Sequence, residues 1–265
     1  MDPRDLFKSG NLTAAIAGIT QEVKRRPADV QARGFLAELL CFAGALDRAD
    51  NQLSIVADQD SARAVPVAQF RQLLRAETAR RQCFEEGRLP QFLAPPPPHI
   101  EKALRALAAL RAGNGAEAAD LLAEAETLRP ATPGRCDDQP FDDLRDADDL
   151  TAGLIEVLTV TGHYHWIPLG EVVEIAFQPP QRPRDLLWRR ARLSVLSGPD
   201  GEVFIPALYP TVPADAGDAV RLGHTTLWSD QPGLPVRGIG QRLFLAGERD
   251  VAITEIATLR FEGSR

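Results

Sequence analysis

Two short stretches repeat each other at a fixed interval and decide the fold of the front half of the chain. Residues 9–16 read Ser-Gly-Asn-Leu-Thr-Ala-Ala-Ile, and residues 43–50 read Ala-Gly-Ala-Leu-Asp-Arg-Ala-Asp. Gly10 precedes Gly44 by 34 positions, and the alanines at 15 and 49 keep the same offset. This interval is the tetratricopeptide period, in which each unit is a pair of antiparallel helices. The spacing therefore predicts an array of helical hairpins.

The residue types in these stretches also suit a helical hairpin. Glycine is favoured where the first helix ends in a left-handed conformation, and a small alanine lets the second helix cross closely. A third copy has Gly113 and Ala118 at the same spacing. Pro27 and Pro130 each follow the turn glycine by 17 residues, where a proline would close the second helix. We therefore expect three hairpin units.

The stretch between the second and third copies departs from the repeat. Gly113 lies 69 residues after Gly44, one more than two periods. Residues 65–84 still carry one apolar stripe and are predicted to be helical, with residues 87–90 ending the helix. Residues 94–98 are alanine followed by four prolines, a stiff spacer that cannot donate backbone hydrogen bonds and so redirects the next helix pair without joining a sheet or helix. A plain linker is preferred here over an SH3-type ligand.

After residue 150 the pattern changes to short runs typical of β-strands. Turn-like connectors at 161–162, 197–201 and 247–250 separate them and indicate antiparallel pairing. Trp166, Trp188 and Trp228 all fall in this part, where they would supply a core or a pocket, with a core as the default. The predicted strands are 154–160, 163–167, 172–177, 187–196, 203–208, 241–246 and 251–259.

An acidic stretch lies between the helical and β-type patterns. Seven aspartates occur between Asp137 and Asp149, but without the alternating ligands, central glycine and closing glutamate of a calcium loop. We interpret them as helix caps and as charges that solvate an interdomain loop. The prediction is a multidomain α+β protein: a tetratricopeptide-like helical domain at 1–130, an acidic linker at 131–150, and a β-rich domain with a small antiparallel sheet or barrel at 151–265.

Composition narrows the classes of partner. The chain has 265 residues, 44% apolar, with a formal net charge of −7, so it lacks the basic field that nucleic acids or anionic membranes attract. Its start lacks a signal-peptide pattern, and no window has the roughly 20 apolar residues of a membrane span. Cys41, Cys83 and Cys136 lie far apart, which favours a reducing compartment. A cytoplasmic location is expected.

Familiar catalytic motifs are missing from the sequence. It has no Walker-type loop, G-x-S-x-G, H-E-x-x-H or paired C-x-x-C. His163 and His165 would share one strand face and suggest a metal, but His99 and His224 are the other histidines, with nothing to place them nearby. Residues 238–242 resemble a phosphate loop only superficially, because a β-type run and not a helix N-terminus follows them. No cofactor is predicted, and a metal-dependent enzyme centred on the β-rich domain remains an alternative.

Several short phrases, in their order along the chain, resemble the ImpE/TagJ (SciE-type) family. The resemblance implies an accessory protein of bacterial type VI secretion, linked to virulence, that binds the small subunit of the contractile sheath and is connected to sheath recycling by a ClpV-type ATPase. Residues 150–153 depart from the Arg-Leu-Gly-Pro expected there, and the loop 136–149 is diverged. The phrases are residues 26–29, 36–44, 75–77, 80–81, 154–156, 162–168, 184–188, 205–210, 218–228 and 238–243.

A helical-hairpin array offers a concave face that takes a partner's helix or extended segment. In the repeat frame, the inner face of the first helices carries Arg4, Phe7, Gln31, Glu38 and Phe42. These are the candidate partner-binding residues, and Phe42→Asp is expected to weaken capture while circular dichroism stays native. Two alternatives remain: the β-rich domain buries these positions, or the protein is an architectural scaffold, possibly oligomeric.

Overall fold

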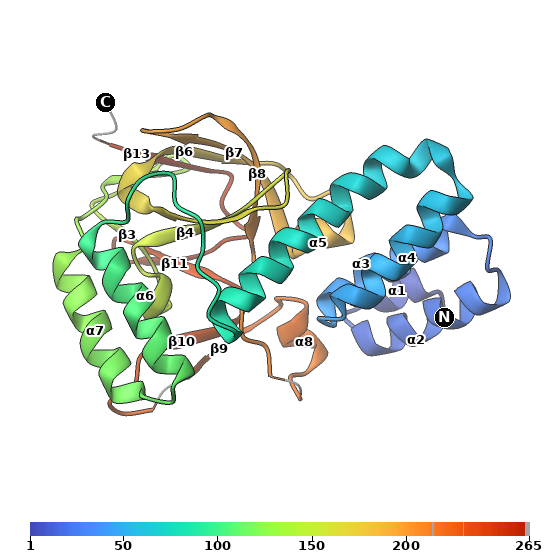
Figure 1. Cartoon of the computed structure of the whole chain (residues 1–265), viewed down its shortest axis with the longest axis horizontal. Helices are drawn as coiled ribbons and strands as arrows, with labels where there is room; N and C mark the ends of the chain where they lie inside the picture. Colours follow the sequence, from blue (N-terminus) through green and yellow to red (C-terminus); the bar gives the residue numbers. More distant parts are fainter. Residues whose placement is uncertain (214, 230, 263–265) are drawn as a thin grey trace.

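The computed structural model describes residues 1–213, 215–229 and 231–262, and its helices precede its strands (Figure 1). The last three residues of the predicted β-rich domain, 263–265, lie outside the described part. The order from helices to antiparallel sheets confirms the predicted α+β fold class. The helices are α1 (Pro3–Lys8), α2 (Leu12–Arg25), α3 (Val30–Phe42), α4 (Leu46–Gln59), α5 (Ala64–Glu85), α6 (Pro98–Arg111), α7 (Gly115–Leu128) and the short α8 (Asp218–Arg221).

The repeated glycines close the predicted helical turns. Gly10, Gly44 and Gly113 have φ of +83°, +76° and +80°, the left-handed region that glycine enters at little cost. In each turn the residue after the glycine donates its N–H to the carbonyl five residues earlier at 2.9 Å, the Schellman pattern. The small residues predicted at the crossings are Ala15, Ala49 and Ala118, each 0% exposed.

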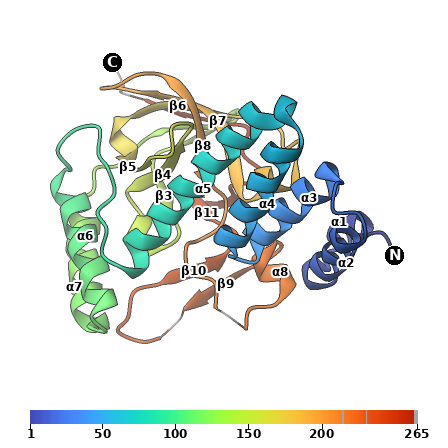
Figure 2. The ribbon, with the colours of Figure 1, turned by 45° about the vertical axis from the view of Figure 1, so that its right-hand side comes forward.

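The long helix α5 connects two groups of helices. Figure 2 shows α1–α4 at one end of the molecule and the α6–α7 hairpin at the other, with α5 between them. The predicted spacer 94–98 overlaps a helix, because Pro98 is the first residue of α6, where its missing N–H does no harm. Just before it, Gln91 pairs with His165 at the edge of a sheet, so the connector is also held by backbone hydrogen bonds.

The strands of the described residues form three antiparallel sheets. An eight-stranded sheet has the order β2-β1-β13-β6-β7-β8-β4-β5, a three-stranded sheet has the order β12-β11-β3, and β9 and β10 form a two-stranded ribbon. The strands are β1 (Gly134–Cys136), β2 (Gln139–Phe141), β3 (Leu144–Asp146), β4 (Leu154–Thr159), β5 (Tyr164–Pro168), β6 (Val172–Phe177), β7 (Trp188–Val195), β8 (Gly201–Pro206), β9 (Thr226–Ser229), β10 (Arg237–Gly240), β11 (Leu243–Ala246), β12 (Arg249–Ala252) and β13 (Thr258–Phe261).

Strand β4 shows how the two faces of the large sheet are used. Ile155 and Val157 point into a core shared with the three-stranded sheet, while Leu154 and Leu158 point into a core shared with the helices. Alternate side chains of a strand lie on opposite faces, so residues 154–158 are all buried because both faces of β4 are covered. The helical core therefore continues onto the sheet, and the division into two separate domains stays a prediction.

The acidic stretch 131–150 is not a solvated linker. It contributes β1 and β2 to the large sheet and β3 to the three-stranded sheet, followed by a 3-10 turn, η2 (Asp149–Thr151). Asp146 and Asp148 are each 0% exposed. Asp148 does cap η2, accepting from the N–H of Leu150 at 2.9 Å. The density of charge in this stretch predicted that its aspartates are exposed to solvent. Asp146 and Asp148 are buried instead, because the tertiary structure supplies partners for their carboxylates.

Other expectations for the back half also need correction. The predicted strand 251–259 is two strands, β12 and β13, separated by a turn, and β9 and β10 were not predicted. Of residues 238–242, which superficially resemble a phosphate loop, the first three lie in β10. Trp166 and Trp188 are buried, but Trp228 is 37% exposed on the two-stranded ribbon, where its ring centroid lies 5.9 Å from that of Tyr209.

Candidate functional site

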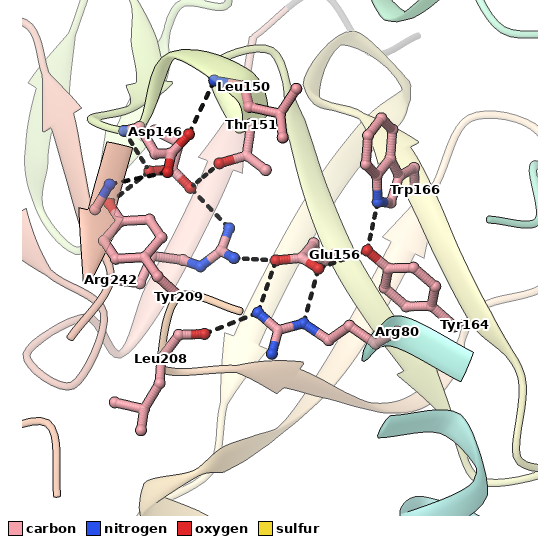
Figure 3. Close-up of polar contacts among 12 residues, drawn as sticks. Arg80, Asp146, Leu150, Thr151, Glu156, Tyr164, Trp166, Leu208, Tyr209 and Arg242 are labelled. Atoms are coloured by element: carbon pink, nitrogen blue, oxygen red, sulfur yellow. Dashed lines mark hydrogen bonds and ion pairs between the residues drawn. The ribbon is translucent and has the colours of Figure 1, made fainter. Parts of the chain in front are cut away.

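A buried pair of charges joins the helical part to the large sheet (Figure 3). Arg80 of α5 donates to both carboxylate oxygens of Glu156 on β4, with Nε–Oε1 at 2.8 Å and Nη2–Oε2 at 3.0 Å. The same Nη2 donates to the backbone oxygen of Leu208 at 2.8 Å. Both side chains are almost fully buried, at 3% and 0% exposure. Such a two-pronged contact is directional, so it fixes how α5 lies on the sheet.

A second arginine extends the pair into a network. Arg242 bonds Glu156 through Nη2 and Asp146 through Nη1, the latter at 2.7 Å. Asp146 also accepts from the hydroxyls of Thr151 at 2.9 Å and Tyr209 at 2.7 Å. Two buried cations therefore face two buried carboxylates, which compensates the charge that burial would otherwise disfavour.

The pKa of Glu156 reports this compensation. Burial on its own would raise the pKa of Glu156, but Arg80 and Arg242 outweigh it and lower the pKa to about 2. Tyr164 supports the ionised form, donating its hydroxyl to Glu156 at 2.6 Å. Glu156 is therefore a carboxylate held in place by its neighbours, which suits a structural joint.

The network reaches the surface through Glu77, one turn before Arg80 on α5. Its Oε2 accepts from the indole N–H of Trp188 at 2.9 Å, and Oε1 lies 3.4 Å from both Arg80 and Arg81. Glu77 is only 5% exposed. These contacts form the floor of an opening between the two parts of the chain.

We call this opening the junction cleft. It is a cavity of about 220 Å³ between the α3–α4 turn, the C-terminal half of α5 and the segment that follows β8. Its Cys41 thiol has a pKa raised by burial and donates to a backbone carbonyl, so it is a poor nucleophile. The arrangement is suited to holding a side chain. The lining residues are Cys41, Phe42, Ala43, Gly44, Glu77, Arg80, Arg81, Glu85, Leu187, Trp188, Leu208, Tyr209, Pro210, Thr211, Val212, Pro213 and Arg221.

Most of the candidate partner-binding residues lie on one face next to this cleft. Phe7 of α1 packs edge-on against Phe42, the last residue of α3, with ring centroids 5.5 Å apart. The guanidinium of Arg4 lies 5.1 Å from the ring centre of Phe35, a second neighbour of Phe7. Gln31 is exposed at the start of α3 and is not brought into this group. Their role in binding stays a prediction.

The back half covers part of the same face, as the alternative interpretation expects. Phe42 is only 5% exposed and lines the junction cleft, so an aspartate there should destabilise the fold and cannot report on binding alone. Glu38 lies 3.9 Å from Arg184 in the 3-10 turn η4 (Pro183–Leu186). Burial raises the pKa of Glu38 to about 7, although Arg184 opposes the shift.

The two histidines of β5 are neighbours, but other histidines are not brought to them. The rings of His163 and His165 are 6.4 Å apart, and His163 Nδ1 contacts the hydroxyl of Thr161 at 3.0 Å. His99 is buried in α6, and His224 is exposed beside Gly10. In residues 1–213, 215–229 and 231–262, no group of three or more His, Cys, Asp or Glu side chains is arranged to hold a metal ion.

Glu77, Arg80 and Arg81 were not predicted as site residues, although the sequence carried a signal. They are spaced i, i+3 and i+4, in phase with the buried Leu73 and Ala76 of the same helix. Charged residues within an apolar stripe indicate buried partners, since an unpaired buried charge is strongly unfavourable. They also fall within the phrases that carry the family resemblance, as do Glu156, Trp188, Tyr209 and Arg242.

The architecture defines a class of protein in which helical hairpins pack on a two-layer antiparallel β structure. A crystal structure of a Vibrio parahaemolyticus protein has the same fold, with a TM-score of 0.91 and 23% sequence identity. The match covers 98% of this chain and 97% of that one. Nearly the whole architecture is therefore shared.

Sequence comparison gives the family. The family model described as ImpE protein matches residues 138–260. The type VI secretion system accessory component TagJ of Pseudomonas aeruginosa is 33% identical over 262 residues, which is 99% of this chain and 92% of that protein. The chain belongs to the ImpE family, which confirms the resemblance found in the sequence.

Proposed function

We propose that this chain is a non-enzymatic accessory component of the type VI secretion system that acts by binding other proteins. The observation that carries the proposal is the 33% identity to TagJ of Pseudomonas aeruginosa over nearly the whole length of both chains. The junction cleft supports binding over catalysis: its lining includes no histidine, and its buried charges are already paired with one another. None of the described helices is long and apolar enough to cross a membrane.

The proposed partner is the small subunit of the contractile sheath, with a link to a ClpV-type ATPase, in the cytoplasm. The proposed contact surface is the inner face that carries Arg4, Phe7, Gln31, Glu38 and Phe42. Arg4 and Phe7 are half-buried at the rim of this face, where a partner helix can reach them. Glu38 and Phe42 lie beneath this rim, where they would hold its residues in position without contacting the partner themselves.

Titration of the purified small sheath subunit into this chain by calorimetry tests the proposal. Arg4→Glu should weaken binding about tenfold, because the reversed charge faces the partner. Arg105→Glu is the matched control, since Arg105 is exposed on α6 at the opposite end of the molecule (Figure 2). Absence of binding by the wild-type chain would refute the proposed partner. Equal losses from both substitutions would refute the proposed surface.

A further inference from the structure

We propose that the junction cleft holds one apolar side chain of a protein partner while Arg81 at its rim binds a carboxylate of the same partner segment. The inference rests on the proposed partner-binding function and names the chemistry of the segment that the site takes. An acidic segment with one large apolar residue is the expected ligand.

The walls of the cleft favour an apolar anchor. Phe42 and Leu187 line it from the two halves of the chain, and Trp188 and Leu208 lie beside them, all buried. A cavity of about 220 Å³ suits a single large side chain and not a whole helix. Buried aromatic and aliphatic pockets of this kind are where protein interfaces concentrate their binding energy.

The charged groups on the floor of the cleft already have partners within the protein, so they need no charged group from the ligand. Glu77 is paired with the Trp188 indole N–H and flanked by Arg80 and Arg81. Arg80 is in turn held by Glu156 and the backbone oxygen of Leu208. An apolar group can therefore cover this floor without leaving a charge that lacks a partner, which would be the main penalty of burial.

The rim supplies the charge preference. Arg81 keeps 31% of its side-chain surface exposed. Its Nη1 donates to the backbone oxygen of Gly44 at 2.7 Å and its Nε lies 3.4 Å from Glu77, but its Nη2 makes no hydrogen bond within the described residues. That nitrogen can donate to a carboxylate. Glu85, which is exposed one turn after Arg81, adds a charge of the opposite sign to the lining.

These charges distinguish ligand classes. The N–H groups of Arg81 Nη2 can donate to a carboxylate, whereas an ammonium group offers them no acceptor and is repelled by the guanidinium charge. A polyanion is a poorer ligand, because the chain as a whole carries a formal charge of −7. Arg81 and Glu85 lie on the same helix and carry opposite charges, so neutralising Arg81 should weaken carboxylate binding and neutralising Glu85 should strengthen it.

The test uses two small probes of the same shape and opposite charge, 3-phenylpropionate and 3-phenylpropylammonium. Each is titrated into the full chain while the indole N–H signal of Trp188 is followed by NMR, with the buried Trp166 signal as an internal reference. We expect the carboxylate to bind about tenfold more tightly than the ammonium, the value of one charge-assisted contact. Arg81→Gln should remove that preference, Arg81→Lys should keep most of it, and Glu85→Gln should strengthen carboxylate binding.

Arg71→Gln is the control, because Arg71 also lies on α5 but is paired with Asp50 outside the cleft. The proposal is overturned if the two probes bind equally, if neither moves the Trp188 signal, or if Arg81→Gln has no effect while its unfolding curve is native. Calorimetry with the small sheath subunit separates the two proposals. Wild-type binding that Arg81→Gln leaves unchanged removes the cleft from the interface, whereas probe selectivity without sheath binding removes the sheath partner.

Discussion

Arg80 on α5 and Glu156 on β4, 76 positions apart in the sequence, share two hydrogen bonds beneath the junction cleft. The pair lies where the helical core meets the outer face of the sheet (Figure 3). Because both groups are out of water, an alternative angle of α5 would leave charges without partners. The orientation of the helical array on the sheet, and with it the shape of the cleft, depends on this contact.

Removing the central carboxylate should be strongly destabilising. Glu156→Ala leaves Arg80 and Arg242 buried beside an empty position, and we expect a loss of about 3–5 kcal/mol in the free energy of unfolding. Glu174→Ala is the control, because Glu174 pairs with the exposed Arg260 and should contribute less than about 1 kcal/mol. Urea unfolding followed by tryptophan fluorescence measures both. Similar small losses for the two variants would contradict a structural role of the network.

Glu38 should make stability fall as the pH rises. Its pKa in the folded protein is raised from 4.5 to about 7 by burial, so between these values the folded state binds more protons than the unfolded state. The stabilisation from the protonated form is complete below pH 4.5 and is lost as the pH passes 7. At about 1.4 kcal/mol per pKa unit, the loss attributable to Glu38 is at most about 3 kcal/mol.

Glu38→Gln tests this sign. The difference in unfolding free energy between pH 5 and pH 8 should shrink in the variant, and the variant should be the more stable protein at pH 8. Glu117→Gln removes a carboxylate from the exposed surface of α7 and is the comparison. A variant that loses stability at pH 8 would show that the ion pair with Arg184 outweighs the burial of Glu38.

Substituting two glycines that have open space around them tests the effect of backbone conformation on stability without a change in packing. A Cβ would meet nothing within 4 Å at Gly113 or at Gly34, but Gly113 has φ of +80° whereas Gly34 lies within α3. Gly113→Ala should destabilise by about 1 kcal/mol, because a left-handed conformation is unfavourable for alanine. Gly34→Ala should stabilise by about 0.5–1 kcal/mol. Thermal unfolding distinguishes the two, and equal effects would contradict the turn assignment.

The three thiols should be unreactive until the protein unfolds. Cys41, Cys83 and Cys136 are free and at most 3% exposed. Burial raises the pKa of each, that of Cys83 to about 12, and only the thiolate reacts rapidly. Ellman's reagent at pH 8 should therefore detect three thiols in denaturant and almost none in the native protein. A thiol that reacts quickly in the native state would show local opening around it.

The helical part of the fold was accessible from local patterns. A left-handed turn favours glycine and a close helix crossing favours a small residue, so the spacing of Gly44 and Ala49 indicates a hairpin without any knowledge of its surroundings. Strands β4 to β8 of the large sheet were similarly visible as apolar runs between turns. The strands of the acidic stretch could not be predicted in this way, because strands of three residues are too short to show a periodicity and depend on partners such as β13.

The candidate site divides in the same way. The sequence by itself determined the hairpin turns, the α+β order and the family, since these depend on residue types at short spacing and on the order of short phrases. Only the tertiary structure decided that Asp146 and Glu156 are buried against Arg242, and that Phe42 and Arg81 border one cleft with Trp188. The physical reason is that an ion pair or a cavity wall joins residues far apart in the chain, and the sequence records neither their distance nor their burial.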